Sequence, residues 1–301
     1  MSITFSANGL HIFMKSVLRG VGQVMFQNNA LTGLIFLCGI FYQSPLYGLA
    51  TLVGSLTSTM TAYLFNLDLD QKQNGLYGFN GALVALGLIY FLEANFSSWC
   101  YATLAAATST VIMQLFLKLL SKNKLPTLTA PFVVTTLIFL SVNTQLNLFR
   151  PAIHSAITPF ENGEWKGIIQ GISQVFFQEN TISGLLMLLG LLINSKRAFI
   201  WAIIGSTIGY ITGLLLSAPH EVLGAGVYGF NGALTALALG SVFLSDHGKN
   251  YAITIMATIL TTLSFVGISK LFLPLGLPVM TLPFVLVTWV FIFFTQKVTS
   301  S

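Results

Sequence analysis

GLYGFNGALVALGLIYF at residues 75–91 returns as GVYGFNGALTALALGSV at residues 226–242, with 11 of 17 positions identical. A second block of sequence is also repeated. QVMFQNNALTGLIFLCGI at residues 23–40 matches QVFFQENTISGLLMLLGL at residues 174–191, with 9 of 18 positions identical. Both pairs are separated by 151 residues, so the chain contains an internal repeat long enough to be a structural unit.

A third block fixes the extent of the repeat. PTLTAPF at residues 126–132 matches PVMTLPF at residues 278–284, at an offset of 152 residues. The segment 149–165 between the copies holds two prolines and two glutamates, as expected of an exposed connection. We therefore expect two homologous halves, residues 1–150 and residues 151–301.

The composition predicts a membrane protein. Hydrophobic residues make up 54% of the 301 residues and charged residues 7%, whereas soluble domains carry about 25% charge. The apolar runs are long and uninterrupted, which favours helices over the alternating segments of a β-barrel. The expected fold class is therefore an all-α integral membrane protein that crosses the cell membrane several times.

The net charge of +5 does not indicate a nucleic-acid partner. Basic residues such as Lys118, Lys122 and Lys124 stand at the ends of apolar segments, which is typical of membrane flanks. Cys38 and Cys100 lie in apolar stretches without a neighbouring cysteine or histidine at ligand spacing. We expect no metal site, no disulfide and no cofactor.

Besides the repeated YGFN segment, each half contains several apolar segments. In the first half they cover residues 8–27, 30–46, 47–66, 98–120 and 131–148. The YGFN segment is short for a span, which takes about 20 residues, and we expect it to enter and leave on one side. Five crossings per half would invert the second half, giving about ten transmembrane helices plus two re-entrant pore helices. This topology puts seven Lys and Arg on the N-terminal side of the membrane and six on the other.

The polar residues that recur in both halves are neutral. They are Gln23 and Gln174, Asn29 and Asn180, Asn80 and Asn231, and Thr129 and Thr281. Recurring aromatic residues accompany them: Phe26 and Phe177, Phe79 and Phe230, and Tyr77 and Tyr228. No acidic residue is matched by an acidic residue deep in both halves, which disfavours a proton relay or a cation filter. A path of amides, hydroxyls and aromatic rings suits a small, neutral, hydrogen-bonding solute.

The paired QV, YGFN and T-x-P-F blocks resemble those of the urea transporter family, over residues 19–296. The resemblance implies passive, channel-like transport of urea, and a homotrimer with one pore in each protomer. It also implies two slots between aromatic rings that are joined by a narrow middle. The short tails are typical of a bacterial member, for which the expected location is the inner membrane.

When the pore-lining positions of the family are matched residue by residue to this chain, the resemblance implies ten of them here. The first half supplies Gln23, Phe26, Phe79, Leu83 and Thr129, and the second supplies Gln174, Phe177, Phe230, Leu234 and Thr281. Structural roles compete with some of these assignments. Thr129 and Thr281 precede a proline by two residues, so either could cap a helix, and Asn80 and Asn231 could tie neighbouring segments together.

Other functions remain open at this point. A channel for ammonia, water or a short amide would use the same kind of path. An alternating-access carrier would need an ion site, which the sequence does not offer. A membrane enzyme would need a nucleophile, a base or a metal cluster, and no such constellation recurs, so we expect a transporter and not an enzyme.

Overall fold

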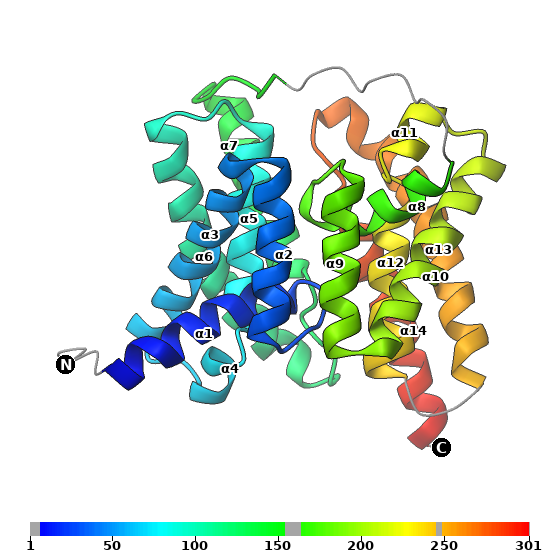
Figure 1. Ribbon diagram of the computed structural model, residues 1–301, viewed down its shortest axis with the longest axis horizontal. Coiled ribbons are helices and arrows are strands. Elements are labelled where there is room, and N and C mark those ends of the chain that lie inside the picture. The colour runs from blue at the N-terminus through cyan, green and yellow to red at the C-terminus, as the bar shows by residue number, and fades with distance from the viewer. Residues whose placement is uncertain (1–6, 154–163, 245–248, 301) are drawn as a thin grey trace.

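The computed structural model describes residues 7–153, 164–244 and 249–300, and these residues form helices and no strand (Figure 1). The first half contributes helices up to Leu146. They are α1 (Ala7–Gln23), α2 (Ala30–Gln43), α3 (Pro45–Leu64), α4 (Leu69–Gln73), α5 (Gly78–Phe91), α6 (Phe96–Ser121) and α7 (Ala130–Leu146). The expected all-helical fold is therefore confirmed for the described residues.

The second half begins with α8 (Glu164–Ser173), η1 (Gln174–Phe176), α9 (Thr181–Asn194), α10 (Lys196–Leu215) and α11 (His220–Gly224). It ends with α12 (Gly229–Leu237), the π-helix η2 (Ala238–Phe243), α13 (Lys249–Phe272), η3 (Leu273–Leu275) and α14 (Leu282–Ser300). The helices α9, α10, α11 and α12 begin 151 residues after α2, α3, α4 and α5. The order of elements thus repeats along the chain.

Matching contacts hold the helices of each half together. The hydroxyl of Ser55 on α3 donates to the carbonyl of Val17 on α1 at 2.8 Å, and that of Ser206 on α10 donates to Ile168 on α8 at 2.6 Å. The helix after each YGFN motif packs against α3 or α10. A Cβ on Gly54 would lie 2.2 Å from the carbonyl oxygen of Gly81, so this close approach requires glycine.

The two halves lie side by side, and α2 and α9 pack against each other between them (Figure 1). The hydroxyl of Thr32 on α2 donates to the carbonyl of Gly190 on α9, and that of Ser183 on α9 donates to the carbonyl of Gly39 on α2. The helix α7 lies in the upper part of Figure 1 and α14 in the lower part, and both begin near the middle of the molecule. This places two helix N-termini in the interior.

Within the described residues, four segments are long and apolar enough to cross a membrane by length and composition. They are Phe96–Ser121, Lys196–Leu215, His220–Phe243 and Asn250–Leu275. The helices α2 and α5, with 14 residues each, rise about 21 Å, short of the roughly 30 Å hydrocarbon core. The chain is a multi-pass membrane protein, and its number of crossings stays a prediction.

The structure has a bent helix pair at a different place from the YGFN motif, where the sequence predicted the re-entrant segment. The helical segments Trp165–Phe176 and Thr181–Asn194 meet at 75°, as in a broken span or a re-entrant loop. The segment His220–Phe243, which contains the second YGFN motif, is long and apolar enough to cross. In the first half, α1 likewise ends at Gln23 and the chain turns before α2 begins at Ala30.

Candidate functional site

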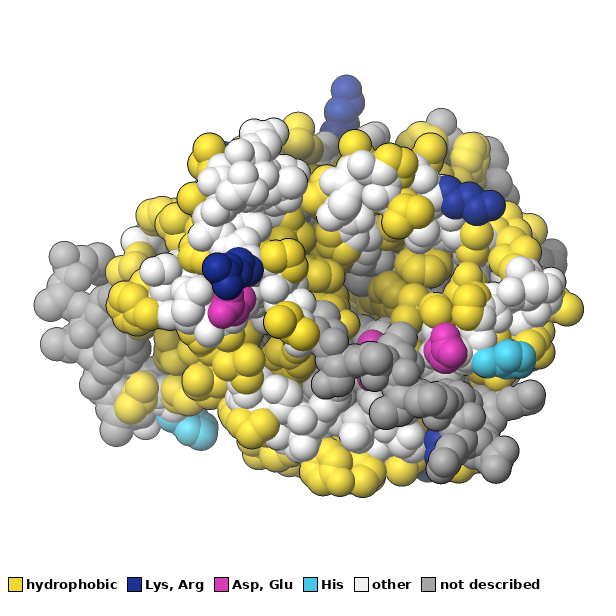
Figure 2. Space-filling view, turned by 90° about the horizontal axis from the view of Figure 1, so that it is seen from above, with side chains coloured by type: hydrophobic (Ala, Val, Ile, Leu, Met, Phe, Trp, Pro, Cys, Tyr) yellow, Lys and Arg dark blue, Asp and Glu magenta, His cyan; other side chains and the backbone are white. Residues whose placement is uncertain are grey.

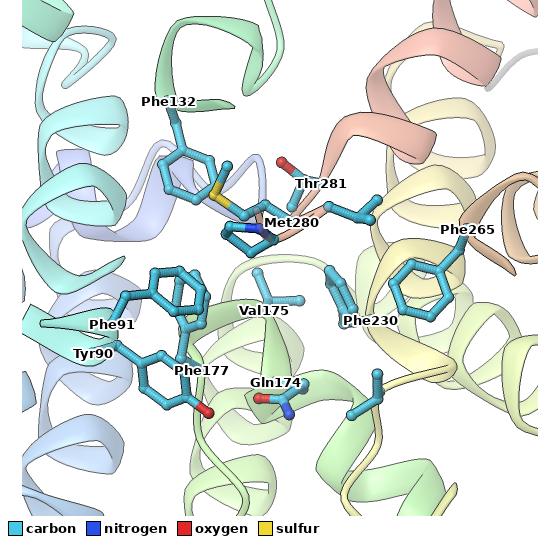
Figure 3. Close-up of a pocket in the computed structure, with 13 residues that line it drawn as sticks. Tyr90, Phe91, Phe132, Gln174, Val175, Phe177, Phe230, Phe265, Met280 and Thr281 are labelled. Carbon is cyan, nitrogen blue, oxygen red and sulfur yellow. The ribbon is translucent and has the colours of Figure 1, made fainter. Parts of the chain in front are cut away.

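Two cavities with matching walls lie in the interior. The larger, of about 180 Å³, is lined by Tyr90, Phe91, Phe132, Gln174, Val175, Phe177, Val227, Phe230, Phe265, Pro278, Val279, Met280 and Thr281 (Figure 3). The smaller, of about 110 Å³, is lined by Gln23, Val24, Phe26, Leu76, Phe79, Pro126, Thr127, Leu128, Thr129 and Phe243. Nine of the ten residues of the smaller cavity have their repeat partner in the larger one, from Gln23 and Gln174 to Thr129 and Thr281. We call them the 180 Å³ chamber and the 110 Å³ chamber.

The chambers meet at a pair of threonines. The hydroxyl oxygens of Thr129 and Thr281 are 2.7 Å apart and share a hydrogen bond. Both residues are buried, and each lines one chamber. Thr129 stands at the N-cap of α7, yet its side chain makes no capping hydrogen bond. The capping role considered for Thr129 is therefore absent, and its hydroxyl belongs to the junction between the chambers.

The backbone before each threonine is held in an uncommon conformation. Leu128 has a φ of 50° and Met280 a φ of 51°, in the left-handed region that non-glycine residues rarely adopt. The segments that contain them lead into the protein without regular structure before α7 and α14 begin. Each segment lines a chamber, through Thr127 and Leu128 in one half and through Val279 and Met280 in the other.

The asparagine of each YGFN motif anchors the start of a later helix. The side-chain oxygen of Asn80 accepts a hydrogen bond from the backbone N–H of Phe132 at 3.0 Å. Asn231 does the same for Phe284 at 3.3 Å. Both asparagines are buried, so these bonds replace partners that the first N–H groups of a helix lack. The tying role considered for the two asparagines is confirmed.

Phe26 and Phe177 link the two halves through their rings. Phe26 packs edge-on against Phe284 at 6.2 Å between centroids, and Phe177 packs edge-on against Phe132 at 6.3 Å. Both have positive φ values, 61° for Phe26 and 56° for Phe177. These turns end α1 and η1 and aim each ring at the helix start of the other half. The chambers are therefore built by both halves together.

Gln174 brings an unsatisfied acceptor to the 180 Å³ chamber. Its Oε1 is buried and has no hydrogen-bond partner. Figure 3 shows the amide at the end of the cavity away from Thr281, below Val175. Its repeat partner Gln23 is oriented by a bond from Nε2 to the carbonyl of Asn74 at 3.0 Å. A buried acceptor without a donor favours a solute that carries N–H groups.

Among the described residues, neither chamber is lined by a charged side chain or a histidine. Within the same described residues, no group of three or more His, Cys, Asp or Glu could hold a metal ion. A charged solute would lose its hydration in either chamber without gaining a counter-ion. The walls consist of aromatic rings, aliphatic side chains, amides and hydroxyls, which suits a neutral polar molecule.

A third cavity adjoins the 110 Å³ chamber. It has a volume of about 360 Å³ and is lined by Lys124, Leu125, Pro126, Phe243, Leu244, Ile292, Thr295 and Gln296. It shares Pro126 and Phe243 with the 110 Å³ chamber. The segment between them changes from exposed at Lys124 to buried at Thr127, so the chain descends into the protein here. We call this cavity the outer pocket.

At the opposite face, seen in Figure 2, hydrophobic side chains surround a hollow and charged side chains are few.

The structure brings together most of the residues that the sequence predicted. Gln23, Phe26, Phe79 and Thr129 line one chamber, and Gln174, Phe177, Phe230 and Thr281 line the other. Leu83 and Leu234 are fully buried and line neither cavity, so their role in the pore stays a prediction.

Sequence reasoning missed several residues of the walls. The missed residues include Tyr90, Phe91, Phe132, Phe243, Phe265, Leu128 and Met280. Leu128 and Met280 directly precede the threonines of the repeated T-x-P-F blocks, so the repeat could have identified them. The repeat could not identify Phe91 and Phe243, because at an offset of 151 residues it pairs Phe91 with Val242 and Phe243 with Leu92.

The sequence is similar to proteins of one family. The family described as "Urea transporter" matches residues 14–296. "Urea transporter 1" of Ovis aries is 32% identical, covering 95% of this chain and 78% of that protein. The proteins of the same name from Capra hircus and Mus musculus are 32% and 30% identical with the same coverage. The resemblance drawn from the repeated blocks is confirmed by these matches.

Proposed function

The chain belongs to the urea transporter family, and we propose that it conducts urea passively across the cytoplasmic membrane through one path in each protomer. Members of this family are transporters and not enzymes. The observation that carries the proposal is the pair of matched, uncharged chambers that meet at Thr129 and Thr281. A path of this kind offers a solute similar surroundings on both sides of a narrow middle.

The chemistry of the walls fits urea. Urea is flat and neutral, with N–H donors at both nitrogens and a carbonyl acceptor. The free Oε1 of Gln174 and the hydroxyls of Thr129 and Thr281 accept such donors in place of water. The rings of Phe79 and Phe230 are buried beside the chambers and confine a flat molecule. Few strong contacts hold the solute, which rapid permeation requires.

We infer that the chain crosses the membrane ten times as two inverted halves. We assign the re-entrant segments to α1 with its turn after Gln23, and to α8 and η1 with their turn after Phe176, in place of the YGFN helices. The 75° bend and the length of His220–Phe243 support this assignment. The opposite positions of α7 and α14 in Figure 1 support the inversion.

We propose that the lower side of Figure 1 faces the cytoplasm. Of the 13 Lys and Arg, all but Arg150, Lys166 and Lys270 belong to segments at this side: α1, α4, the end of α6, the turn between α9 and α10, the start of α13 and the end of α14. The expected distribution was nearly even. Treating α1 as re-entrant moves Lys72, Lys196 and Arg197 to this side, and the resulting excess favours a cytoplasmic location.

Flux measurements in proteoliposomes test the function. We expect urea, supplied as a gradient without any ion gradient, to equilibrate much faster than in empty liposomes. Acetamide, ammonia and water are the alternative permeants, and their rates relative to urea define the selectivity. Transport of one of these without urea would overturn the proposal, and urea flux that needs a sodium or proton gradient would identify a carrier. The homotrimer is part of the proposal, and native mass spectrometry of the purified protein tests it.

A further inference from the structure

The helix after the second YGFN motif contains a π-turn that its counterpart lacks. In the second half, the N–H of Leu244 donates to the carbonyl of Leu239, five residues earlier, at 3.0 Å. In the first half, the N–H of Leu92 donates to the carbonyl of Leu88, four residues earlier, at 2.9 Å. Such turns are rare and often occur at functional sites, because they add one residue to a helix and rotate the later side chains about its axis.

The π-turn changes which side chain faces the 110 Å³ chamber. At the offset of 151 residues that holds through the YGFN block, Phe243 pairs with Leu92. The added residue raises the offset to 152, and Phe243 then pairs with Phe91. The ring geometry agrees: Phe91 meets Phe177 edge-on at 5.6 Å and 88°, and Phe243 meets Phe26 edge-on at 6.1 Å and 88°. Because of the π-turn, the aromatic Phe243 takes the place in the wall that an unshifted repeat would give to Val242.

Three side chains of the second half support the π-turn. The Nε of Arg197 on α10 donates to the carbonyl of Gly240, inside the π-turn, at 2.8 Å. The ring of Trp201 packs so close that a Cβ on Gly240 would lie 2.4 Å from it. The first half has Leu46, Ala50 and Ile89 at the three matching positions. The arginine, the tryptophan and the glycine therefore occur together only where the helix is a π-helix.

Phe243 forms a partition between the 110 Å³ chamber and the outer pocket. Its side chain lines both the 110 Å³ chamber and the outer pocket, and it is 36% exposed. Phe243 is the aromatic residue common to the two linings, and its ring meets Phe26 of the 110 Å³ chamber edge-on. The space left by this contact limits the width of a solute that passes.

We propose that Phe243 determines the size of solute admitted between the outer pocket and the 110 Å³ chamber, and that Arg197 is a positioning residue that holds the π-turn carrying Phe243. This rests on the proposed function, since it assigns selectivity to one end of the same path. Urea passes the partition, and amides with an added methyl group are held back.

The first test compares N-methylurea with urea in proteoliposomes. Phe243→Ala should raise the ratio of N-methylurea flux to urea flux about tenfold, since a methyl group in a tight apolar site discriminates by that order. Phe243→Leu, which keeps more bulk, should give a smaller rise. The matched control is Phe96→Ala, at an 85% exposed ring that lines neither chamber and not the outer pocket. An unchanged ratio in both Phe243 variants would overturn the assignment.

Arg197 is tested by replacement with the residue of the first half. Arg197→Leu should raise the same ratio because the carbonyl of Gly240 loses its donor and the π-turn its support. Arg197→Lys keeps a donor and should lie between the native protein and Arg197→Leu. Wild-type selectivity in Arg197→Leu would contradict the positioning role while leaving that of Phe243 intact.

A second readout does not depend on transport. In a background with Cys38→Ser and Cys100→Ser, Thr127→Cys places one thiol in the wall of the 110 Å³ chamber. Adding Phe243→Ala or Arg197→Leu should speed modification of this thiol by a small hydrophilic reagent several-fold. Unchanged modification rates would overturn the partition. A faster reaction in a protein that conducts no urea would instead reject the proposed function and keep the partition.

Discussion

The hydroxyls of Thr129 and Thr281 share a hydrogen bond of 2.7 Å across 152 residues of chain. Each ends an irregular segment that leads from the surface to the middle of the molecule. Because the two hydroxyls bond to each other, a solute that passes between the chambers must replace this bond with its own. The junction is therefore a point of the proposed path at which hydroxyl groups of both halves meet the solute.

Replacing both hydroxyls by methyl groups should slow urea flux. Thr129→Val with Thr281→Val keeps the volume and removes two hydrogen-bond partners of the solute worth about 1 kcal/mol each, so we expect a decrease of about 30-fold in proteoliposome flux. Thr136→Val with Thr288→Val is the matched control. These threonines are also buried and related by 152 residues, but their hydroxyls have no partner and line neither chamber. Equal effects of the two pairs would argue against a role for the junction.

Gln174 should contribute to solute passage through its free acceptor. Gln174→Met keeps the length of the side chain and removes Oε1, so urea loses a hydrogen-bond partner in the 180 Å³ chamber. We expect urea flux to fall by about threefold to tenfold, from a loss of roughly 1 kcal/mol. Gln170→Met, one helical turn earlier and outside both linings, should leave the flux near its native value.

The asparagines of the YGFN motifs should matter for stability. Asn80→Ala or Asn231→Ala leaves the buried N–H of Phe132 or Phe284 without an acceptor, which costs about 1–3 kcal/mol. Thermal unfolding of the purified protein in detergent should show a lowered midpoint for each variant. Asn123→Ala, at an exposed position, serves as control and should unfold like the native protein. A native midpoint for both motif variants would show that these bonds do not stabilise the helix starts.

Urea flux should not depend on pH near neutrality. The described walls of the chambers contain no carboxylate, amine or imidazole, so no group there changes charge between about pH 6 and pH 8. Proteoliposomes with equal pH inside and outside should give the same rate across this range. A rate that follows a single titration would indicate an ionisable group on the path.

The proposed orientation predicts the labelling of two surface positions. In a background without Cys38 and Cys100, Arg150→Cys should react with a membrane-impermeant maleimide added to intact cells. Lys124→Cys, also at an exposed residue, should react only after the membrane is opened. The reverse pattern would invert the protein in the membrane.

The sequence by itself determined the helical class, the internal repeat and the family. Composition and long apolar runs leave few alternatives to helices in lipid, and three blocks repeat closely enough to be aligned by eye. The repeat also located eight of the residues that line the chambers, since a path built by two copies uses the same positions twice.

Only the tertiary structure decided how these residues meet. The bond between Thr129 and Thr281, and the packing of Phe26 and Phe177 on the opposite half, join segments that are far apart in the chain. The sequence predicted a span over residues 8–27, whereas α1 ends at Gln23, because the apolar residues Val24, Met25 and Phe26 continue past the end of the helix. The role of Phe243 was hidden for a different reason: a π-turn shifts the register by one residue within a helix, and Arg197, which supports it, comes from another helix.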